Sequence, residues 1–482
     1  MEKGINKNGN DENVVAVNNS AAKGDFSVGS VRRQIISLAL PMTLAQLINL
    51  LYSIVDRMYL GRMADGGSLA LTGVGLVIPI VSILMSVAGL CGTGGAPLFS
   101  IARGRGDDEE AGKILGNSFA LLVLLGAAMT IGVIVFQRPI LYAFGTSDAT
   151  YPYASQYLSI YMLGTLFVMI SLGMNSFINA QGAAKRGMMT VALGAIVNIV
   201  LDPIFIFALN MGVRGAALAT IIAQGCSAVW VLIYLTGKSA VVKLRLEYLR
   251  LSARRVGQIV ALGLSGFVMN LTNSLIQIIC NKTLATYGGD LFIGVMTVVN
   301  AVREIVFMPV QGINSGATPV MGYNYGAGED NRLRTAIRFS MTLTVGYTFV
   351  VWVAIMLVPQ LFAGLFSKEA ELITAAVRSM RLYYAMSVFM ALQMTSQGVF
   401  VALGKSKQAV FFSLLRKAFI AAPLTVLLPR FVLGGTALGV DGVFLADTVS
   451  QLLGGLACGS TMYFTLYRKL EREPKVVVTQ RH

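Results

Sequence analysis

The sequence predicts an all-α polytopic membrane protein, with twelve transmembrane helices in two parallel six-helix repeats around a central cavity. Three observations predict this fold class: the chain is strongly apolar, its apolar runs are long enough to cross a bilayer, and its second half repeats the first. Of the 482 residues, 55% are hydrophobic and 13% are charged. A water-soluble chain carries about 25% charged residues, so a soluble globular protein and a disordered chain are both excluded.

Twelve apolar runs account for most of the chain. A membrane-spanning helix needs about 20 predominantly apolar residues, because the hydrocarbon core of a bilayer is roughly 30 Å thick. Backbone polar groups find no water there, so each run is predicted to be helical. In chain order, we expect the spans at 34–60, 68–100, 114–136, 151–181, 187–209, 214–236, 257–287, 291–325, 333–360, 370–403, 409–431 and 438–466.

Two sets of residues recur at a nearly constant offset and indicate an internal duplication. In the first set, an offset of 222 residues relates Pro97, Gly104, Gly106 and Asp108 to Pro319, Gly326, Gly328 and Asp330. In the second set, an offset of 227 relates Gly212, Gly215, Ala219 and Gln224 to Gly439, Gly442, Ala446 and Gln451. Each repeat holds an even number of helices, so both halves enter the membrane in the same direction. Parallel repeats of this kind are typical of transporters whose substrate site lies between the halves.

Basic residues predict the orientation of the chain. Most of the 38 lysines and arginines fall in the terminal segments and in the loops that follow every second span, which all lie on one side of the membrane. The loops on the other side have only Arg62, Arg138, Arg214, Lys368 and Arg430. Because cytoplasmic loops carry the excess of basic residues, both termini are predicted to be cytoplasmic in a protein of the plasma or inner membrane. This bias also accounts for most of the net charge of +15 without nucleic acid as a partner.

The domain organisation follows from the spans and loops. Residues 1–31 are polar and form a predicted disordered cytoplasmic tail. A six-helix bundle over 32–236 is followed by a basic, leucine-containing cytoplasmic connector over 237–256, which we expect to lie along the membrane surface. The second bundle covers 257–466, and a cytoplasmic tail covers 467–482.

Residue usage argues against an enzyme. The one histidine, His482, is the last residue, so histidine catalysis and histidine metal cages are excluded from the membrane body. The four cysteines are far apart and form no CxxC pair, so neither a zinc site nor a disulfide framework is indicated. The only acidic run, 107–110, opens a predicted helix, where negative charge is favourable without any catalytic role.

Acidic residues within predicted spans are functional candidates, because charge is costly inside a membrane. Asp202 has Asn198 four residues earlier, on the same helix face, and lies about 10 Å from the outer end of its helix. Thr220 and Asp56 lie about 9 Å and 6 Å from the outer ends of two other helices. These oxygen-bearing side chains at similar depth suit Na⁺, and the two carboxylates equally suit a proton that loads and unloads near neutral pH.

Other interpretations of these polar residues stay open at the level of the sequence. Asparagines and glutamines in the spans are also typical of interhelical hydrogen bonding, and Asp56 has Arg57 as a possible local partner. In the second half, Glu304 and Asp447 lie in predicted spans, and Glu304 has Arg416 or Lys417 as possible structural partners at similar depth.

These features together resemble the multidrug and toxic compound extrusion (MATE) family of secondary transporters, over residues 32–466. The marks of this resemblance are the twelve helices in two repeats, the Leu40-Pro41 pair, Asp56 ahead of Gly61, Asn198-x3-Asp202-Pro203 and the two Gly-x-Gly turns. The resemblance implies a cation site in the first half formed by Asp56, Asn198, Asp202 and Thr220. The chain differs from family members that carry acidic residues in the seventh and tenth helices. Its seventh span, 257–287, carries Gln277 and Cys280, and its tenth span, 370–403, has only Glu371 at its start.

The predicted function is a cation-coupled efflux antiporter that exports drugs or amphipathic, often cationic, organic compounds by alternating access. Na⁺ or H⁺ is the expected coupling ion, no cofactor is expected, and the protein is predicted to be a monomer among membrane lipids. Two prolines that remove helix hydrogen bonds, Pro41 and Pro203, are the predicted hinges. The predicted substrate-cavity residues are Asn49, Tyr52, Asn175, Gln393 and Gln397. The alternative is a flippase or exporter of a lipid-linked or other metabolite in the same superfamily.

Overall fold

The computed structural model describes residues 24–61, 67–366, 369–433 and 436–472. Their contacts divide the chain into two compact units. The first unit comprises residues up to Gly263 together with Gly322–Ala327, and the second comprises Leu264–Met321 and the residues from Gly328 onward. Most of the predicted tails, 1–23 and 473–482, lie outside the described residues.

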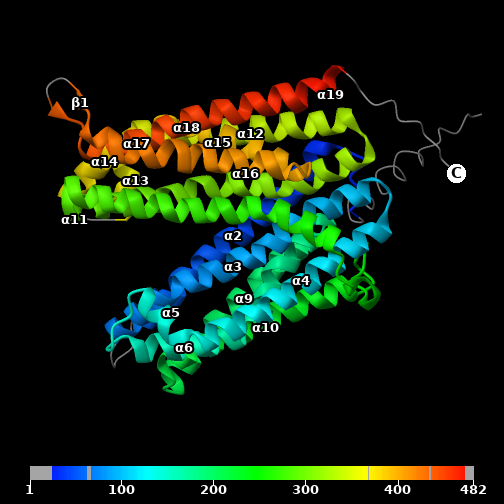
Figure 1. The fold of residues 1–482 in the computed structure, drawn as a ribbon, viewed down its shortest axis with the longest axis horizontal. Coiled ribbons are helices and arrows are strands. Elements are labelled where there is room, and N and C mark those ends of the chain that lie inside the picture. The colour runs from blue at the N-terminus through cyan, green and yellow to red at the C-terminus, as the bar shows by residue number, and fades with distance from the viewer. Residues whose placement is uncertain (1–23, 62–66, 367–368, 434–435, 473–482) are drawn as a thin grey trace, which may run out of the picture. The chain divides into compact units, whose positions relative to one another are not determined.

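The first unit is a bundle of helices (Figure 1). Residues 165–180 form one segment in which a π-helical turn separates two short α-helices. A second π-helical turn, at 204–208, follows the helix that ends at Pro203. Its elements are α2 (Val31–Gly61), α3 (Gly67–Gly104), α4 (Asp108–Val135), α5 (Gln137–Ala143), α6 (Tyr151–Leu163), α7 (Thr165–Met169), η1 (Ile170–Met174), α8 (Asn175–Ala180), α9 (Ala184–Pro203), η2 (Ile204–Ala208), α10 (Gly212–Thr236) and the 3₁₀ turn η3 (Leu246–Leu249).

The second unit repeats this plan, and α11 begins in the first unit and continues into the second. A two-residue antiparallel pair of strands lies at the end of this bundle opposite α19 (Figure 1). Its elements are α11 (Ala253–Ala327), α12 (Asp330–Leu357), α13 (Pro359–Gly364), α14 (Ala370–Tyr384), α15 (Ser387–Ala402), α16 (Ser406–Leu414), η4 (Leu415–Ala421), α17 (Ala422–Leu427), η5 (Leu428–Arg430), β1 (Val432–Leu433), β2 (Thr436–Ala437), α18 (Val440–Met462), η6 (Tyr463–Tyr467) and α19 (Arg468–Arg472).

The predicted twelve spans are confirmed. Among the described residues, nine helices are long and apolar enough to cross a membrane, and two bent helix pairs raise this number to eleven. The helix Ala253–Ala327 is interrupted at Gly289, where φ is 65° and the backbone leaves the helical region, so it supplies two spans. Large apolar side chains on the outer surface, including Ile131, Val350 and Phe419, are exposed, as expected for surfaces that face lipid.

The repeat explains where the helices bend and turn. The bend of 62° after Leu163 and the bend of 49° after Tyr384 lie in equivalent helices of the two halves. Left-handed backbone occurs at four positions, two in each half, that the 222-residue offset relates: Gly106 and Gly328, Gly182 and Gly404. Residues with a Cβ rarely adopt this conformation, so the turns require the glycines that recur in the sequence.

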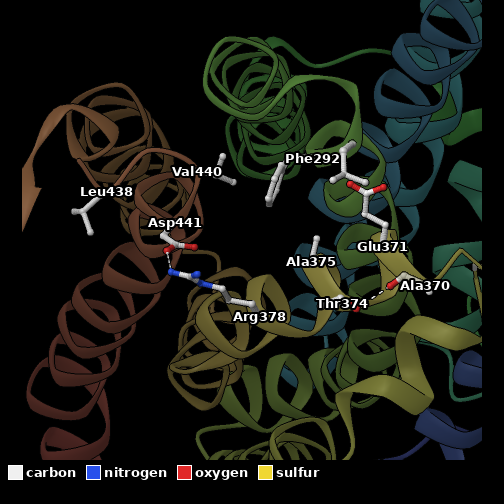
Figure 2. Close-up of a pocket in the computed structure, with 10 residues that line it drawn as sticks. Phe292, Ala370, Glu371, Thr374, Ala375, Arg378, Leu438, Val440 and Asp441 are labelled. Atoms are coloured by element: carbon white, nitrogen blue, oxygen red, sulfur yellow. Dashed lines mark hydrogen bonds and ion pairs between the residues drawn. The ribbon is translucent and has the colours of Figure 1, made fainter. Parts of the chain in front are cut away.

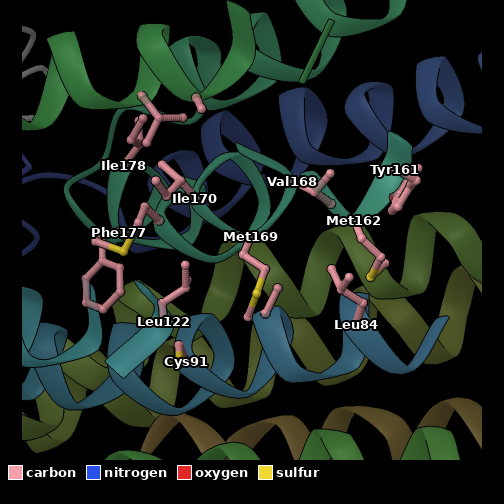
Figure 3. Close-up of a cluster of buried hydrophobic side chains, with 14 of the residues drawn as sticks. Leu84, Cys91, Leu122, Tyr161, Met162, Val168, Met169, Ile170, Phe177 and Ile178 are labelled. Atoms are coloured by element: carbon pink, nitrogen blue, oxygen red, sulfur yellow. The ribbon is translucent and has the colours of Figure 1, made fainter. Parts of the chain in front are cut away.

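A core of buried apolar side chains holds the first unit together. Figure 3 shows Leu122 between Phe177 and Met169, which come from the interrupted segment after α6, and Leu84 beside Met162 of α6. The second unit has its own core, which includes Val299, Tyr384 and Phe444. Each unit therefore buries its own apolar surface.

Residues just before the first helix, α2, pack against the first unit. Phe26 is buried and packs edge-on against Tyr323, with ring centroids 5.7 Å apart. Burial raises the pKa of Asp25, but hydrogen bonds from Ser27 and Tyr323 and the charge of Arg103 outweigh burial, so that this pKa is lowered overall. One aromatic and one acidic side chain thus anchor the end of the polar tail.

The connector is tied to the first unit by side-chain amides. Asn117 of α4 donates to the carbonyl oxygen of Arg250 at 3.0 Å and accepts from the amide of Ser252 at 2.8 Å. Gln181 accepts from the amide of Val241 at 2.8 Å. Leu246 stays almost fully exposed, which fits the predicted contact of the connector with a membrane surface.

Candidate functional site

The centre of the candidate site is a hydrogen-bonded trio on α9 and α10. Asn198 Nδ2 donates to Asp202 Oδ1 at 3.2 Å and to Thr220 Oγ1 at 3.4 Å. The three residues are 1%, 0% and 4% exposed, respectively. The spacing of four residues on α9 predicts the first contact, and the similar depth of two neighbouring helices predicts the second. The structure thus brings these three predicted residues together.

Two oxygen atoms in this trio receive no hydrogen bond from any residue that the structure describes. Asn198 Oδ1 is buried and lacks a hydrogen-bond partner among the described residues. Asp202 Oδ2 is buried without a donor there and has the carboxyl group of Asp56 as its neighbour. Thr220 Oγ1 donates its own proton to the carbonyl oxygen of Ala216 at 3.0 Å, so this oxygen faces the trio as an acceptor. Buried acceptors without donors are costly and rare, and a cation or a proton bound among them would satisfy them.

Asp56 approaches the trio from α2, which packs along α9. It is partly buried and is the principal electrostatic partner of Asp202. The side chain of Arg57 lies outside the described part of the chain, so the alternative of a local Asp56–Arg57 pair stays open. Two carboxylates in a buried setting repel each other, which favours binding of positive charge.

Three tyrosines surround the two carboxylates. Tyr52 of α2 and Tyr157 and Tyr161 of α6 all interact electrostatically with Asp56, and Tyr52 also reaches Asp202 and Thr220. The rings of Tyr157 and Tyr161 stack with centroids 5.9 Å apart. From the sequence, Tyr52 is predicted to line the substrate cavity, whereas Tyr157 and Tyr161 have no predicted role. One feature of the sequence does single out Tyr161, because the offset of 222 residues relates it to Tyr383 in the second repeat.

Three of the other four predicted substrate residues hold helices together. Asn175 Nδ2 donates to the carbonyl oxygen of Gly187 at 3.2 Å, and Gln397 Nε2 makes the repeat-equivalent bond to Ala409 at 2.9 Å. Gln393 Nε2 donates to the carbonyl oxygen of Phe412 at 3.3 Å. Asn49 is exposed on α2. These contacts give Asn175, Gln393 and Gln397 a structural role, and a contact with substrate stays a prediction for all five residues.

The two predicted hinges differ in their surroundings. Pro41 lies inside α2, which continues on both sides of it. Pro203 ends α9 and is followed directly by the π-helical turn η2. π-helical turns are frequent at functional sites, and this one begins at Ile204, two residues after Asp202. The role of either proline as a hinge stays a prediction.

The possible pairing of Glu304 with Arg416 or Lys417 is wrong. Glu304 is exposed and makes no ion pair with any residue that the structure describes. The electrostatic partner of Arg416 and Lys417 is instead Asp447 of α18. The reason is geometric: Arg303 and Glu304 are neighbours on α11, so they point in different directions, and only Arg303 faces the interior.

A pocket of about 640 Å³ opens in the second unit between α11, α14 and α18 (Figure 2). Arg378 of α14 reaches across it to form an ion pair with Asp441 of α18, and Glu371 lies near Phe292 on its other side. None of the predicted site residues lines it, and Arg378 is well exposed, so we assign it no function.

Comparison with known proteins places this geometry in context. The MatE family model matches residues 41–204 and 266–427, once in each half. The chain is 24% identical to the multidrug export protein MepA of Staphylococcus aureus strain N315 over 441 residues, covering 91% of this chain and 95% of that protein. It is also 24% identical to the multidrug export protein MepA of Staphylococcus saprophyticus over 429 residues, covering 89% and 93%.

Two solved structures share the fold. A multidrug resistance MATE family transporter in an outward-facing conformation aligns with a TM-score of 0.84 at 22% identity, over 94% of this chain and 98% of that one. A MATE structure in a bent conformation aligns with a TM-score of 0.86 at 22% identity, over 93% and 98%. The two six-helix repeats of this chain therefore have the architecture of those transporters.

Proposed function

Because the chain belongs to the multidrug and toxic compound extrusion family, whose members are transport proteins rather than enzymes, we propose that it is a cation-coupled efflux antiporter. Its cargo is proposed to be drugs or amphipathic, often cationic, organic compounds, as the names of the MepA relatives suggest. The coupling ion is Na⁺ or H⁺ and no cofactor takes part. The protein acts as a monomer in the cell membrane, with both termini cytoplasmic.

One observation carries the proposed coupling. The buried acceptors Asn198 Oδ1 and Asp202 Oδ2 have no donor in the described part of the chain, and Asp56 adds a second carboxylate beside them. Oxygen atoms from carboxylate, amide and hydroxyl groups are the ligands that hard cations prefer. The same pair of carboxylates can share a proton. Both ions would remove the cost of leaving the two acceptors unsatisfied.

Coupling requires the cation to favour one conformation over the other. A ligand shifts a conformational equilibrium only by the difference between its affinities for the two states. A cation bound among Asp56, Asn198 and Asp202 would draw α2 and α9 together, because the two carboxylates repel each other without it. The turn after Pro203 is the element proposed to absorb this movement.

The proposal is tested with purified protein in vesicles loaded with a fluorescent cationic dye. We expect dye efflux under an inward Na⁺ gradient or an inward pH gradient, applied separately, and not without a gradient. The gradient that drives efflux identifies the coupling ion. Equal efflux with and without both gradients would rule out cation coupling while leaving transport itself in place.

The proposed topology has its own test. A cysteine placed at the exposed Lys238 of the connector, with the four native cysteines replaced by alanine, is expected to resist an impermeant thiol reagent in intact cells. The same cysteine should react fully after the cells are opened. Labelling in intact cells would place the connector outside the cell and would contradict the proposed cytoplasmic location of the connector and both termini.

A milder effect is expected at the hydroxyl ligand. Thr220→Ala removes one oxygen of the trio but leaves both carboxylates and Asn198 in place. We expect the cation concentration for half-maximal efflux to rise about tenfold, which corresponds to roughly 1.4 kcal/mol, with maximal efflux nearly unchanged. Thr220→Ser keeps the hydroxyl and serves as the matched control. A loss of maximal efflux in Thr220→Ala alone would contradict a simple ligand role.

A further inference from the structure

Three basic side chains meet inside the second unit, and the proposed function uses none of them. They are Arg303 of α11 and Arg416 and Lys417 of η4; we refer to them as the basic cluster. Arg416 is 6% exposed and Lys417 is 8% exposed. Arg416 and Lys417 lie ten and eleven residues from the start of the helical segment Ser406–Arg430, or about 15 Å along it, near the middle of a membrane span.

The packing around Arg416 is built to hold this side chain. A Cβ on Gly454 of α18 would lie 2.8 Å from Arg416 Cγ, so only glycine leaves room for the aliphatic part of the arginine. Both basic residues of η4 stand in a π-helical turn, a distortion that is frequent at functional sites. An accidental buried charge would not be expected to have a glycine and a distorted turn arranged around it.

The charges within the basic cluster do not balance. Asp447 of α18 interacts electrostatically with all three basic residues, and its carboxylate accepts from Ser450 Oγ at 3.3 Å and Gln451 Nε2 at 3.1 Å. Neither Arg416 nor Lys417 forms a hydrogen bond or an ion pair within 4 Å to any residue the structure describes. Guanidinium groups stay protonated in proteins, and one carboxylate cannot neutralise those of both Arg303 and Arg416. Uncompensated charge at this depth is strongly unfavourable.

The repeat places this cluster where the first unit has its acidic site. An offset of 227 residues relates Thr220 to Asp447, and an offset of 222 relates Tyr161 to Tyr383, which interacts with Asp447. The first unit thus holds two carboxylates at this place, whereas the second holds three basic groups and one carboxylate. The scaffold is duplicated, and the sign of its charge is reversed.

We propose that the basic cluster of the second unit binds a compact anionic group. A halide, a phosphate or the carboxylate of an organic acid would supply the negative charge that the cluster lacks, and the planar guanidinium of Arg416 suits a two-point contact with an oxyanion. The shared chemistry is a small anion, which is either free in solution or part of a larger organic compound.

Binding is measured on the whole protein in detergent, with methanesulfonate as the background anion and Na⁺ and ionic strength held constant. Chloride, phosphate and benzoate are titrated separately, and the midpoint of thermal unfolding is followed. We expect a saturable rise in the midpoint. Chloride or phosphate as the effective ligand indicates a free anion, whereas benzoate alone indicates an organic acid as the source.

Variants separate this site from nonspecific effects of salt. Arg416→Gln and Lys417→Gln are each expected to weaken anion binding at least tenfold, and Asp447→Asn to strengthen it, because a competing negative charge is removed. Arg338→Gln removes an exposed positive charge from the same unit and should leave binding unchanged. If Arg416→Gln fails to fold, Lys417→Gln and Asp447→Asn still test the site in opposite directions.

Two outcomes would overturn the proposal. One is the lack of a saturable effect with any of the three anions, and the other is an equal effect in the parent protein and in the Lys417→Gln and Asp447→Asn variants. The cation site is tested independently, because Asp202→Asn in the first unit should bind the anion as the parent does. Failure of cation coupling would therefore leave this inference standing, and the reverse also holds.

Discussion

Asp202→Asn is expected to abolish gradient-driven efflux while the protein stays folded. The substitution keeps the size of the side chain and an oxygen that can accept from Asn198 Nδ2, now 3.2 Å from Asp202 Oδ1. It removes the negative charge, and an amide neither binds a proton near neutral pH nor neutralises Na⁺. Because the cation then has little preference for either conformation, the gradient no longer drives transport.

The measurement combines dye binding by purified protein with dye efflux from vesicles. Dye binding should persist in Asp202→Asn, and efflux under the effective gradient should fall to the level seen without a gradient. Asp148→Asn is the matched control, because Asp148 is exposed and bonds to Tyr142 away from the trio. Gradient-driven efflux that survives in Asp202→Asn would show that the trio is not the coupling site.

Coupling is also expected to be confined to the first unit. The carboxylate of Asp447 lies among three basic groups, and Glu304 is exposed, so neither resembles the pair formed by the buried Asp202 and the partly buried Asp56. Neutralising Asp56 should therefore reproduce the effect of Asp202→Asn, whereas neutralising Asp447 or Glu304 should leave a measurable response to the gradient. Loss of that response only in the second-unit variants would reverse the assignment.

The sequence predicts the spans and the trio for physical reasons that do not need a structure. Apolar length defines a span, and four-residue spacing puts Asn198 and Asp202 on one helix face. Tyr157 and Tyr161 approach the acidic pair because α6 packs against α10, and the spacing of residues in the sequence does not specify this packing. The correct partner of Arg416 depends on which of two neighbours on α11 faces inward, and on the π-helical turn that directs both basic residues to the interior.

Close helix crossing is a second feature whose disruption should have a large effect. Within the first unit, α3 meets α11 at reciprocal glycines: a Cβ on Gly94 would lie 2.1 Å from the carbonyl oxygen of Ile259, and one on Gly263 would lie 2.0 Å from that of Leu90. No real Cβ approaches a backbone oxygen so closely, so the helices would have to separate. Small residues at helix crossings are typical of membrane proteins.

Gly94→Ala is therefore expected to destabilise the protein even though alanine favours helices over glycine by about 1 kcal/mol. The clash is with backbone, which cannot move away as a side chain can, and overpacking of this kind costs roughly 1–3 kcal/mol or more. We expect a clear fall in the midpoint of thermal unfolding in detergent. This midpoint is measured by size-exclusion chromatography of protein heated to a series of temperatures.

Gly89→Ala on the same helix provides the control with the opposite expected sign. A Cβ at Gly89 meets no atom within 4 Å. Because alanine favours helices over glycine, we expect the midpoint of thermal unfolding of Gly89→Ala to be unchanged or slightly higher than that of the parent. The pair of variants separates the effect of close approach from that of helix propensity, because both add the same methyl group to α3. Gly94→Ala with a midpoint equal to that of Gly89→Ala would mean that α3 and α11 do not cross as closely as the structure shows.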